Sequence, residues 1–189
     1  MADDVTTEDP EEFEKAEGSV LNDIVHISDG LDTGNLITAY SSGIFPWPED
    51  DEMPILWFCP DPRGILKYSN LHVSKSLKKS IRQNNFTVCT DTCFDEVIDK
   101  CAFQKRAGQP GTWITDNTLA AYKDFHKAGY AHSVEIFKDG ELAGGLYGVF
   151  IKNVFSGESM FHTHKDTSKI ALVVLMTLLD QLGITWIDT

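Results

Sequence analysis

The sequence predicts an α+β protein in which a helix packs on a largely antiparallel sheet, and the second half of the chain carries this prediction. The strand patterns HSVEIF and ELAGGLYGVFI are joined by Asp139-Gly140, a dipeptide typical of a β-hairpin turn. Lys152-Asn153 then turns the chain into a third strand, VFSGESMF. The segment SKIALVVLMTLLDQL is apolar nearly all round, which indicates a buried helix, and ITWIDT follows as a last strand. Three consecutive antiparallel strands, a buried helix and another strand are typical of a layered α+β domain.

Length and composition indicate a globular chain. Its 189 residues suffice for one domain of usual size, or one domain with a small subdomain, and 42% hydrophobic content excludes a disordered chain. No apolar run is as long as a membrane span, and the N-terminus lacks the apolar core of a secretory signal. We therefore expect a cytoplasmic protein with no membrane partner. The four cysteines form no CxxC pair and no recognised zinc spacing, so free or buried thiols and no metal are expected.

The net charge of −13 is concentrated at the N-terminus. Residues 1–17 hold eight acids and one base, or −7, which leaves −6 for the rest of the chain. We expect residues 1–30 to form an acidic, partly disordered arm. Acidity argues against wide, non-specific contact with nucleic acid, which depends on neutralising phosphates, but it allows contact through a small basic patch.

The first half of the chain predicts short elements. Thr33 can cap a helix over residues 35–42 that ends at Gly43. Five prolines follow within residues 45–62, so long regular structure is not expected there. This segment is nevertheless too aromatic for a solvated loop. It is either the wall of a pocket or part of an ordinary hydrophobic core, and composition alone favours the core.

The middle of the chain predicts alternating short strands and helices. GILKY is read as a short strand, and Ser74 caps a helix over residues 75–84 with Leu77 and Ile81 inward. FTVCT is a strand, FDEVIDKCA a short amphipathic helix and AGQPGTW a loop, after which Asp116 caps a helix ending at Gly129. The helix over residues 75–84 carries the densest basic cluster of the chain. That cluster is either a solvated face or a phosphate-binding patch, and it comprises Lys75, Lys78, Lys79 and Arg82.

Glu158 and Asp188 are the candidate catalytic residues because both lie in strand patterns among apolar neighbours. Two acids in a partly dry pocket can divide the roles of general base and orienting group, since their environments set their pKa values apart. The alternative is that each is a capping or ion-paired structural acid. Gly144, Gly145 and Gly148 indicate a bulge or a close approach by ligand backbone. The chain contains no GxSxG, P-loop or GxGxxG motif.

An ordered set of segments resembles the leucyl/phenylalanyl-tRNA–protein transferase family. The segments are YSSGIFPWP, PILWFCPDPRGIL, GTWIT, AYKDFHKAGYAHSVEIF, GGLYGV, FSGESMF and the closing WID, and they span residues 35–188. The resemblance implies transfer of leucine or phenylalanine from Leu-tRNA or Phe-tRNA to acceptor proteins with N-terminal Arg or Lys, which marks them for degradation. It also implies a small N-terminal domain, residues 31–70, and an N-acetyltransferase-like domain with a mixed, mostly antiparallel sheet, residues 71–189.

The resemblance also implies the roles of individual residues. Glu158 and Asp188 match catalytic positions at the acceptor amine and the aminoacyl end. The basic cluster is expected to hold tRNA phosphates without reading sequence. The aminoacyl side-chain pocket is expected from Leu146, Phe155, Met160, Leu172, Leu175 and Leu179, and the contacts with the terminal adenosine from Trp47, Trp113, Tyr40 and Tyr122. Because the aminoacyl ester is already activated, no cofactor is expected. We also expect a monomer.

One departure from the family pattern concerns the end of the chain. The family continues with an Asp-x-Gln motif and a C-terminal helix, whereas this chain ends at Thr189, so a shortened domain is expected. Two alternatives therefore stand beside the transferase. One is a short form that binds the aminoacyl-tRNA end or the acceptor peptide without turnover. The other, less favoured because no pyrophosphate-binding glycine loop is found, is an acyl-CoA-dependent N-acyltransferase.

Overall fold

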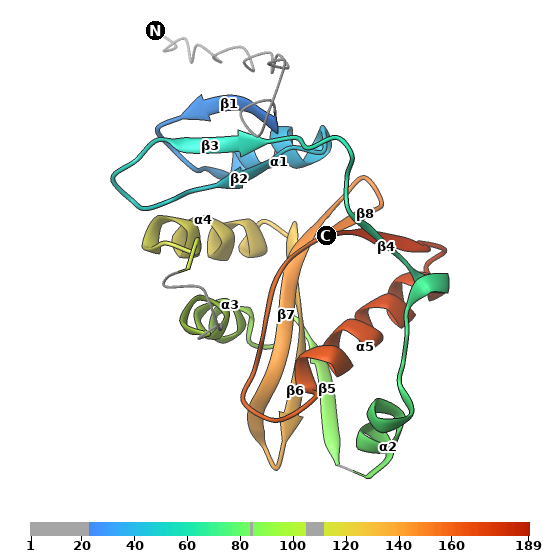
Figure 1. Cartoon of the computed structure of the whole chain (residues 1–189). Coiled ribbons are helices and arrows are strands. Elements are labelled where there is room, and N and C mark those ends of the chain that lie inside the picture. Colours follow the sequence, from blue (N-terminus) through green and yellow to red (C-terminus); the bar gives the residue numbers. More distant parts are fainter. Residues whose placement is uncertain (1–22, 84, 105–111) are drawn as a thin grey trace, which may run out of the picture.

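The computed structural model describes residues 23–83, 85–104 and 112–189, which form two sheets and five α-helices (Figure 1). Residues 1–22 of the predicted acidic arm and most of the predicted loop at residues 107–113 lie outside the described residues. Within the described parts of the chain, no helix is long and apolar enough to traverse a bilayer.

The larger sheet is mixed and mostly antiparallel, which confirms the prediction for the second half of the chain. Its strands follow the order β4 (Ile65–Lys67), β9 (Trp186–Asp188), β8 (Val154–His162), β7 (Glu141–Ile151), β6 (Ala131–Lys138) and β5 (Phe86–Thr90). Only β8 and β9 are parallel, and their register holds the single pair Ser156 and Asp188. The predicted turn at Asp139-Gly140 is present, with both residues at positive φ.

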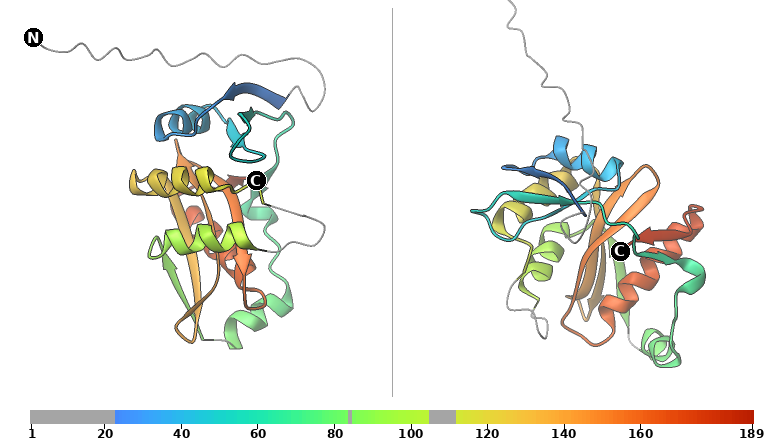
Figure 2. Two further views of the ribbon diagram at one scale, coloured as in Figure 1. Left: turned by 90° about the vertical axis from the view of Figure 1, so that its left-hand side faces the viewer. Right: turned by 45° about the horizontal axis from the view of Figure 1, so that its top comes forward.

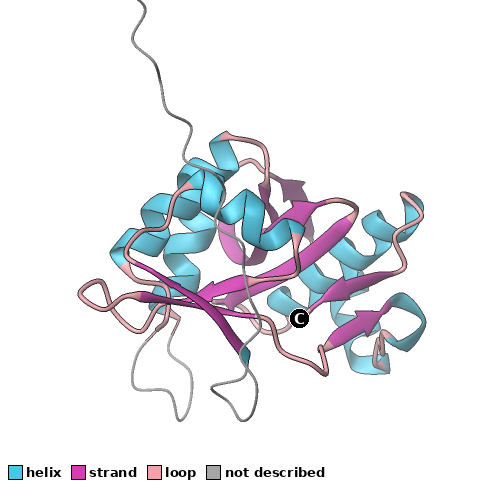
Figure 3. Cartoon of the chain, turned by 90° about the horizontal axis from the view of Figure 1, so that it is seen from above, coloured by secondary structure: helices cyan, strands magenta, loops and turns pink. Residues whose placement is uncertain are grey.

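Helices cover both faces of the larger sheet (Figures 2 and 3). On one face lie α3 (Phe94–Phe103) and α4 (Asp116–Lys127), and on the other lies α5 (Thr167–Gln181). The short helix η2 (Tyr68–Asn70) and α2 (Lys75–Gln83) follow β4 along the side of α5. Side chains alternate along β6, so that Val134 and Ile136 join the core under α5 while Phe137 packs into the core under α3 and α4.

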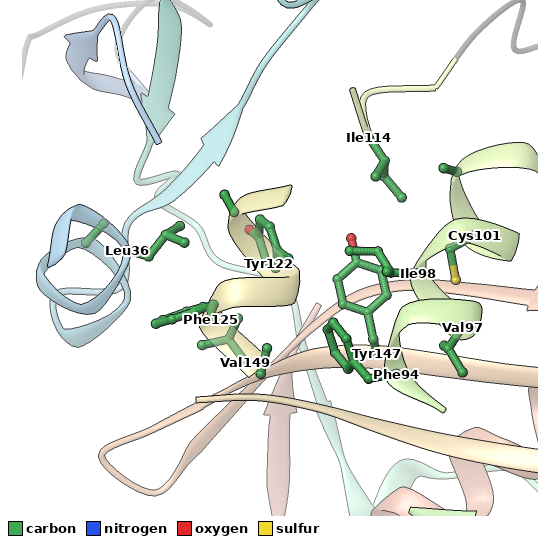
Figure 4. Close-up of a cluster of buried hydrophobic side chains, with 14 of the residues drawn as sticks. Leu36, Phe94, Val97, Ile98, Cys101, Ile114, Tyr122, Phe125, Tyr147 and Val149 are labelled. Carbon is green, nitrogen blue, oxygen red and sulfur yellow. The ribbon is translucent and has the colours of Figure 1, made fainter. Parts of the chain in front are cut away.

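A second, three-stranded antiparallel sheet covers α4. Its order is β1 (Ile24–Ser28), β3 (Ile55–Phe58) and β2 (Phe45–Trp47), and α1 (Thr33–Ser41) connects β1 to β2. Leu36 of α1 and Tyr122 of α4 are fully buried in the core that also contains Tyr147 of β7 (Figure 4). The N-terminal elements therefore share one hydrophobic core with the larger sheet.

Several sequence expectations about the elements need correction. The cap of α1 is Asp32, which accepts from the Asn35 amide, and the cap of α4 is Thr115, each one residue before the predicted cap. In both cases two neighbouring residues can cap, and the one with extended backbone does so. Ile81 is 38% exposed because α2 packs through Leu77 alone, and Leu178 on α5 is 40% exposed, so α5 is buried along one face rather than all round.

Two further findings concern the proline-rich segment and the glycines. Residues 45–58 form only the short strands β2 and β3, which agrees with the prediction that long regular structure is not expected there, and their prolines lie at strand ends or on an edge strand. A bulge does occur beside Gly148, but the space at the glycines is occupied by the chain itself. A Cβ at Gly148 would lie 2.3 Å from the Ser156 carbonyl oxygen, and one at Gly144 would lie 2.2 Å from Thr167 Oγ1. The predicted free thiols are confirmed for all four cysteines.

Candidate active site

Glu158 occupies a β-bulge in the centre of the larger sheet. Tyr147 and Gly148 of β7 pair with Ser159 and Gly157 of β8, which leaves Glu158 as the extra residue between them. A bulge bends its strand and redirects the side chain of the extra residue. The carboxylate of Glu158 is thereby turned toward α1 and α4, away from the regular alternation of β8.

Two tyrosine hydroxyls hold the Glu158 carboxylate. Tyr40 of α1 donates a hydrogen bond of 2.6 Å to Oε1 of Glu158, and the hydroxyls of Tyr40 and Tyr122 lie 2.5 Å apart. Tyr122 of α4 is also 3.5 Å from Oε2. Each hydroxyl carries one proton, and Tyr40 uses its proton for the hydrogen bond to Glu158. In the short contact between the two hydroxyls Tyr122 is therefore the donor and Tyr40 the acceptor. Burial and the nearby carboxylate raise the pKa of both tyrosines, which keeps these donors protonated.

The position of Glu158 tunes its pKa into the neutral range. Burial raises the pKa of Glu158 from 4.5 to about 7, since removing a carboxylate from water disfavours the charged form. The hydrogen bond from Tyr40 works in the opposite direction, the charge of Asp188 raises the pKa further, and Arg63 lowers it. A carboxylate with a pKa close to neutral is suited to accept and return a proton at physiological pH.

Asp188 forms a bidentate ion pair with Arg63. Nε of Arg63 donates to Oδ1 of Asp188 over 2.5 Å, the Arg63 Nη2 group donates to Oδ2, and Ser156 donates to Oδ2 over 3.3 Å. The Arg63 guanidinium also lies 4.5 Å from the centre of the Phe45 ring. The Asp188 side chain is only 9% exposed, so its charge is compensated inside the protein. The pair connects the loop after β3 to β9.

Two adjoining cavities meet at Glu158. The first, about 230 Å³, has the polar groups of Arg63 and Asp188 in its wall. The second, about 430 Å³, is mainly apolar and is lined by residues of β4, β7, β8, β9 and α5 together with Trp47 and Trp113. Both cavities are lined by Trp47, Trp113, Gly157, Glu158 and Thr189. The carboxylate therefore stands at the junction of a polar and an apolar compartment.

The apolar cavity contains most of the residues expected for an aminoacyl side-chain pocket. Its wall includes Leu146, Phe155, Met160, Leu172 and Leu175. Leu179 is the exception, because it is buried further along α5 in the core. Sequence reasoning missed Leu66 of β4 and Ile187 of β9, which also line the cavity. The signal that could have found them was the adjacent apolar pair in each predicted strand, Ile-Leu in GILKY and Trp-Ile in TWID.

The residues expected at the adenosine separate into two groups. The rings of Trp47 and Trp113 are stacked, with centroids 5.8 Å apart and an interplanar angle of 22°. They form an aromatic wall at both cavities. Tyr40 and Tyr122 lie instead behind Glu158, and Tyr122 is fully buried, so its hydroxyl meets the carboxylate rather than an open cavity.

The basic cluster of α2 is exposed and lies apart from both cavities. Lys75, Lys78, Lys79 and Arg82 are all exposed, and α2 lies at the opposite end of the molecule from the C-terminus and β8–β9 (Figures 1 and 2). Within the described residues, no group of three or more His, Cys, Asp or Glu side chains is arranged to hold a metal ion.

Arg63 is the functional residue that sequence reasoning overlooked. It is the single basic residue within residues 45–64, a segment rich in aromatic and acidic side chains. A lone arginine at the end of such a segment is a candidate partner for a distant carboxylate, and this was the signal available in the sequence.

Comparison with known proteins adds a consistent set of matches. A family model described as leucyl/phenylalanyl-tRNA protein transferase matches residues 65–189, and the model of the N-terminal domain of the same proteins matches residues 29–61. The leucyl/phenylalanyl-tRNA–protein transferase of Oleidesulfovibrio alaskensis is 46% identical over 182 residues, covering 94% of this chain and 73% of that protein. The protein of the same name from Hydrogenovibrio crunogenus is 51% identical over 154 residues, covering 82% of this chain and 60% of that protein.

A more distant likeness is found among solved structures. The structure of L-PGS from Bacillus licheniformis superposes with a TM-score of 0.42 at 12% identity, covering 82% of this chain and 49% of that one. With respect to the curated relatives, the chain spans between about 60% and 73% of their length.

Proposed function

Because this chain belongs to the leucyl/phenylalanyl-tRNA–protein transferase family, a family of aminoacyltransferases, we propose that the two cavities at Glu158 are its aminoacyl-transfer site. The reaction moves leucine or phenylalanine from aminoacyl-tRNA to the N-terminal amino group of an acceptor protein. The new N-terminal residue is destabilising and directs the acceptor to degradation. The observation that carries the assignment to the site is the position of Glu158 in the wall shared by a polar and an apolar cavity.

The apolar cavity is the proposed site of the leucyl or phenylalanyl side chain. Among the residues that the structure describes, Glu158 is the single charged side chain in its lining. A charged side chain entering it would lose its hydration without compensation, so desolvation disfavours such a donor. The stacked Trp47 and Trp113 are the proposed platform for the terminal adenosine, since base–aromatic stacking contributes about 1–3 kcal/mol.

The fold assigned to the transfer domain is the N-acetyltransferase type. What supports it is the single parallel contact of β8 and β9 in an otherwise antiparallel sheet, and the apolar cavity that opens beside these two strands. An activated acyl group held in such an opening lies beside the bulge residue of the central strand. That arrangement suits attack by an amine entering from the polar cavity.

Glu158 is the proposed general base. The neutral amine of the acceptor attacks the carbonyl carbon of the aminoacyl ester, and a tetrahedral intermediate forms. Glu158 accepts a proton from the attacking nitrogen and returns it to the ribose oxygen, which leaves as the hydroxyl of the tRNA end when the C–O bond breaks. The base regains its charge, so protons balance over the cycle. A carboxylate pKa of about 7 is close to that of an α-amino group, which makes the first transfer nearly isoenergetic. The second transfer is favourable because the oxygen that develops on the ribose as the C–O bond breaks is much more basic than the carboxylate.

The polar cavity is the proposed site of the acceptor. Glu158 and Asp188 both line it, and Arg63 compensates the charge of one of them. The remaining negative charge favours an N-terminal residue with a cationic side chain, which supports acceptors that begin with Arg or Lys. The Asp188–Arg63 pair is proposed to orient the acceptor amine toward the ester.

The basic cluster of α2 is the proposed contact for tRNA phosphates. Its four exposed cations lie on one helix in a chain of net charge −13, so a local patch rather than the whole surface would attract the acceptor stem. The donor is a cytoplasmic molecule, which supports a cytoplasmic site of action.

The decisive experiment is transfer of labelled leucine from charged tRNA to a peptide with N-terminal arginine. The full chain should label this peptide and leave an N-acetylated copy unlabelled. Glu158→Gln should lower the transfer rate at least a hundredfold while puromycin, an aminoacyl-adenosine mimic, still binds within a few-fold. Binding of puromycin by the unaltered chain without transfer would overturn the catalytic assignment and leave a binding protein. Retained turnover in Glu158→Gln would remove Glu158 from the mechanism.

A further inference from the structure

The loop between β2 and β3, residues 48–54, is fastened to the start of α4 through Asp51. Oδ2 of Asp51 accepts the amide N–H of Asp116 over 3.2 Å, and Oδ1 accepts the amide N–H of Asn117 over 3.1 Å. The amide of Thr118 is bound by the side chain of Thr115 over 3.2 Å. The first three amides of α4 are thus satisfied, two of them by a residue 65 positions earlier in the chain.

Charge as well as geometry favours this contact. A carboxylate at a helix N-terminus interacts favourably with the aligned peptide dipoles. Hydrogen bonds from the side chain of Thr115 and from the Asn117 and Asp116 amides lower the pKa of Asp51, so the carboxylate remains ionised at neutral pH. The contact of Asp51 with α4 is therefore maintained at neutral pH, where the transfer reaction would be measured.

These hydrogen bonds connect the two segments that carry the tryptophans of the aromatic wall. Trp47 precedes Asp51 by four residues, and Trp113 precedes Asp116 by three. Trp47 is 48% exposed, so core packing alone does not hold its ring. Its aromatic neighbours are Phe45, Phe58 and Trp113, and only Trp113 belongs to the transfer domain. The hydrogen bonds that Asp51 accepts from the Asp116 and Asn117 amides join the two segments that carry the stacked rings.

We propose that Asp51 is a positioning residue that fixes the spacing of Trp47 and Trp113 by fastening the β2–β3 loop to α4. This inference rests on the proposed function for the identity of the ligand that the two rings face. Asp51 itself touches neither cavity wall, so it acts through the rings. Loosening the loop widens or disorders the wall and weakens binding of an aminoacyl nucleoside, while the chemistry at Glu158 is unchanged once the ligand is bound.

The test compares Asp51→Ala and Asp51→Asn with Glu52→Ala. Glu52 lies in the same loop and carries the same charge, but the hydrogen bonds to α4 are made by Asp51. Asp51→Ala should raise the Kd for puromycin and the KM for Leu-tRNA about tenfold, with kcat within twofold of the unaltered chain. Asparagine keeps one acceptor oxygen and should recover part of the loss. Glu52→Ala should bind and react as the unaltered chain does.

A ligand-free measurement separates this inference from the proposed function. Two stacked tryptophans give an exciton couplet in the circular dichroism spectrum. The variant Trp47→Phe lacks the Trp47–Trp113 pair, so its spectrum is the reference without the couplet. Asp51→Ala should lose most of the couplet while its Tm stays close to that of Glu52→Ala. An Asp51→Ala protein that keeps the couplet, or that loses it only together with its Tm, would overturn the positioning role. A chain that fails to bind puromycin would refute the proposed function and leave the couplet test intact.

Discussion

The hydroxyl of Tyr40 donates a hydrogen bond of 2.6 Å to Oε1 of Glu158, across 118 positions of sequence. Tyr40 belongs to α1, which is matched by the model of the N-terminal domain, whereas Glu158 lies in residues 65–189, which are matched by the model of the transferase. The protonation of the candidate base is therefore set jointly by both parts of the chain. Tyr122 adds a third element, α4, through its contact of 2.5 Å with the Tyr40 hydroxyl.

Tyr40→Phe should shift the pH dependence of transfer. The Tyr40 hydrogen bond stabilises the ionised carboxylate and so lowers the pKa of Glu158; its loss raises that pKa above about 7. The acid limb of kcat/KM should move to higher pH, with about a tenfold loss at pH 7 that is largely recovered at pH 8.5. Tyr122→Phe, which leaves the Tyr40 donor in place, should shift the limb less. An acid limb that stays in place in Tyr40→Phe would show that this hydrogen bond does not tune the base.

Glu158→Gln should stabilise the fold at alkaline pH. The pKa of Glu158 is raised from 4.5 to about 7 on folding, so the stability linked to its protonation is fully present below pH 4.5 and is lost as the pH rises through 7. Glutamine carries no charge at any pH and avoids that loss. The variant should gain up to about 3 kcal/mol in free energy of unfolding at pH 8.5 and nothing at pH 4. Urea titrations at the two pH values measure the difference, and an equal effect at both would refute the raised pKa.

Arg63→Met should destabilise the chain and impair transfer. It leaves the buried Asp188 carboxylate without its partner, and removing one member of a largely buried pair costs about 3 kcal/mol. Loss of the nearby cation also raises the pKa of Glu158 further. Lys100→Ala is a suitable control, because its pair with Glu96 is solvent-exposed and contributes less than about 1 kcal/mol. The double variant Arg63→Met/Asp188→Asn should recover stability but not activity. Thermal unfolding that is equal for Arg63→Met and Lys100→Ala would contradict this account.

Met160→Ala should change donor preference. Met160 lines the apolar cavity, so its truncation leaves more room and favours phenylalanyl over leucyl donors by a few-fold in kcat/KM. Leu179→Ala is the matched variant: Leu179 is 5% exposed but lies outside the cavity, so it should lower stability by about 2–5 kcal/mol without altering preference. Charged Leu-tRNA and Phe-tRNA measured in competition provide the ratio. An unchanged ratio in Met160→Ala would place this side chain outside the pocket.

The larger sheet was predictable from sequence because its signals are local. Turn dipeptides at Asp139-Gly140 and Lys152-Asn153, strand patterns between them and an apolar helix specify β6, β7, β8 and α5. Both candidate carboxylates were also found from their apolar surroundings. The division of the chain into domains and the roles of the site residues stay predictions. The small N-terminal sheet was missed, since its strands are only three to five residues long and therefore carry little periodicity, and β2 contains a proline.

Partners at long range could not be predicted in the same way. No spacing rule joins Arg63 to Asp188, 125 positions apart, or Tyr40 to Glu158, because such pairs depend on how whole elements pack. The family resemblance named Tyr40 and Tyr122 but assigned them to the adenosine. The structure shows that packing of α1 against α4 brings their hydroxyls to the carboxylate instead.

The bulge at Glu158 makes the geometry of the candidate site depend on the number of residues in β8 as well as on their identity. With Glu158 as the supernumerary residue of β8, the strand before it and the strand after it are each in register with β7. A one-residue deletion there would join the two halves into an uninterrupted ladder and turn the carboxylate out of its place, even if every other side chain were kept. A relative that lacks one residue at this point would thus keep the same sheet but would not present a carboxylate in the same place.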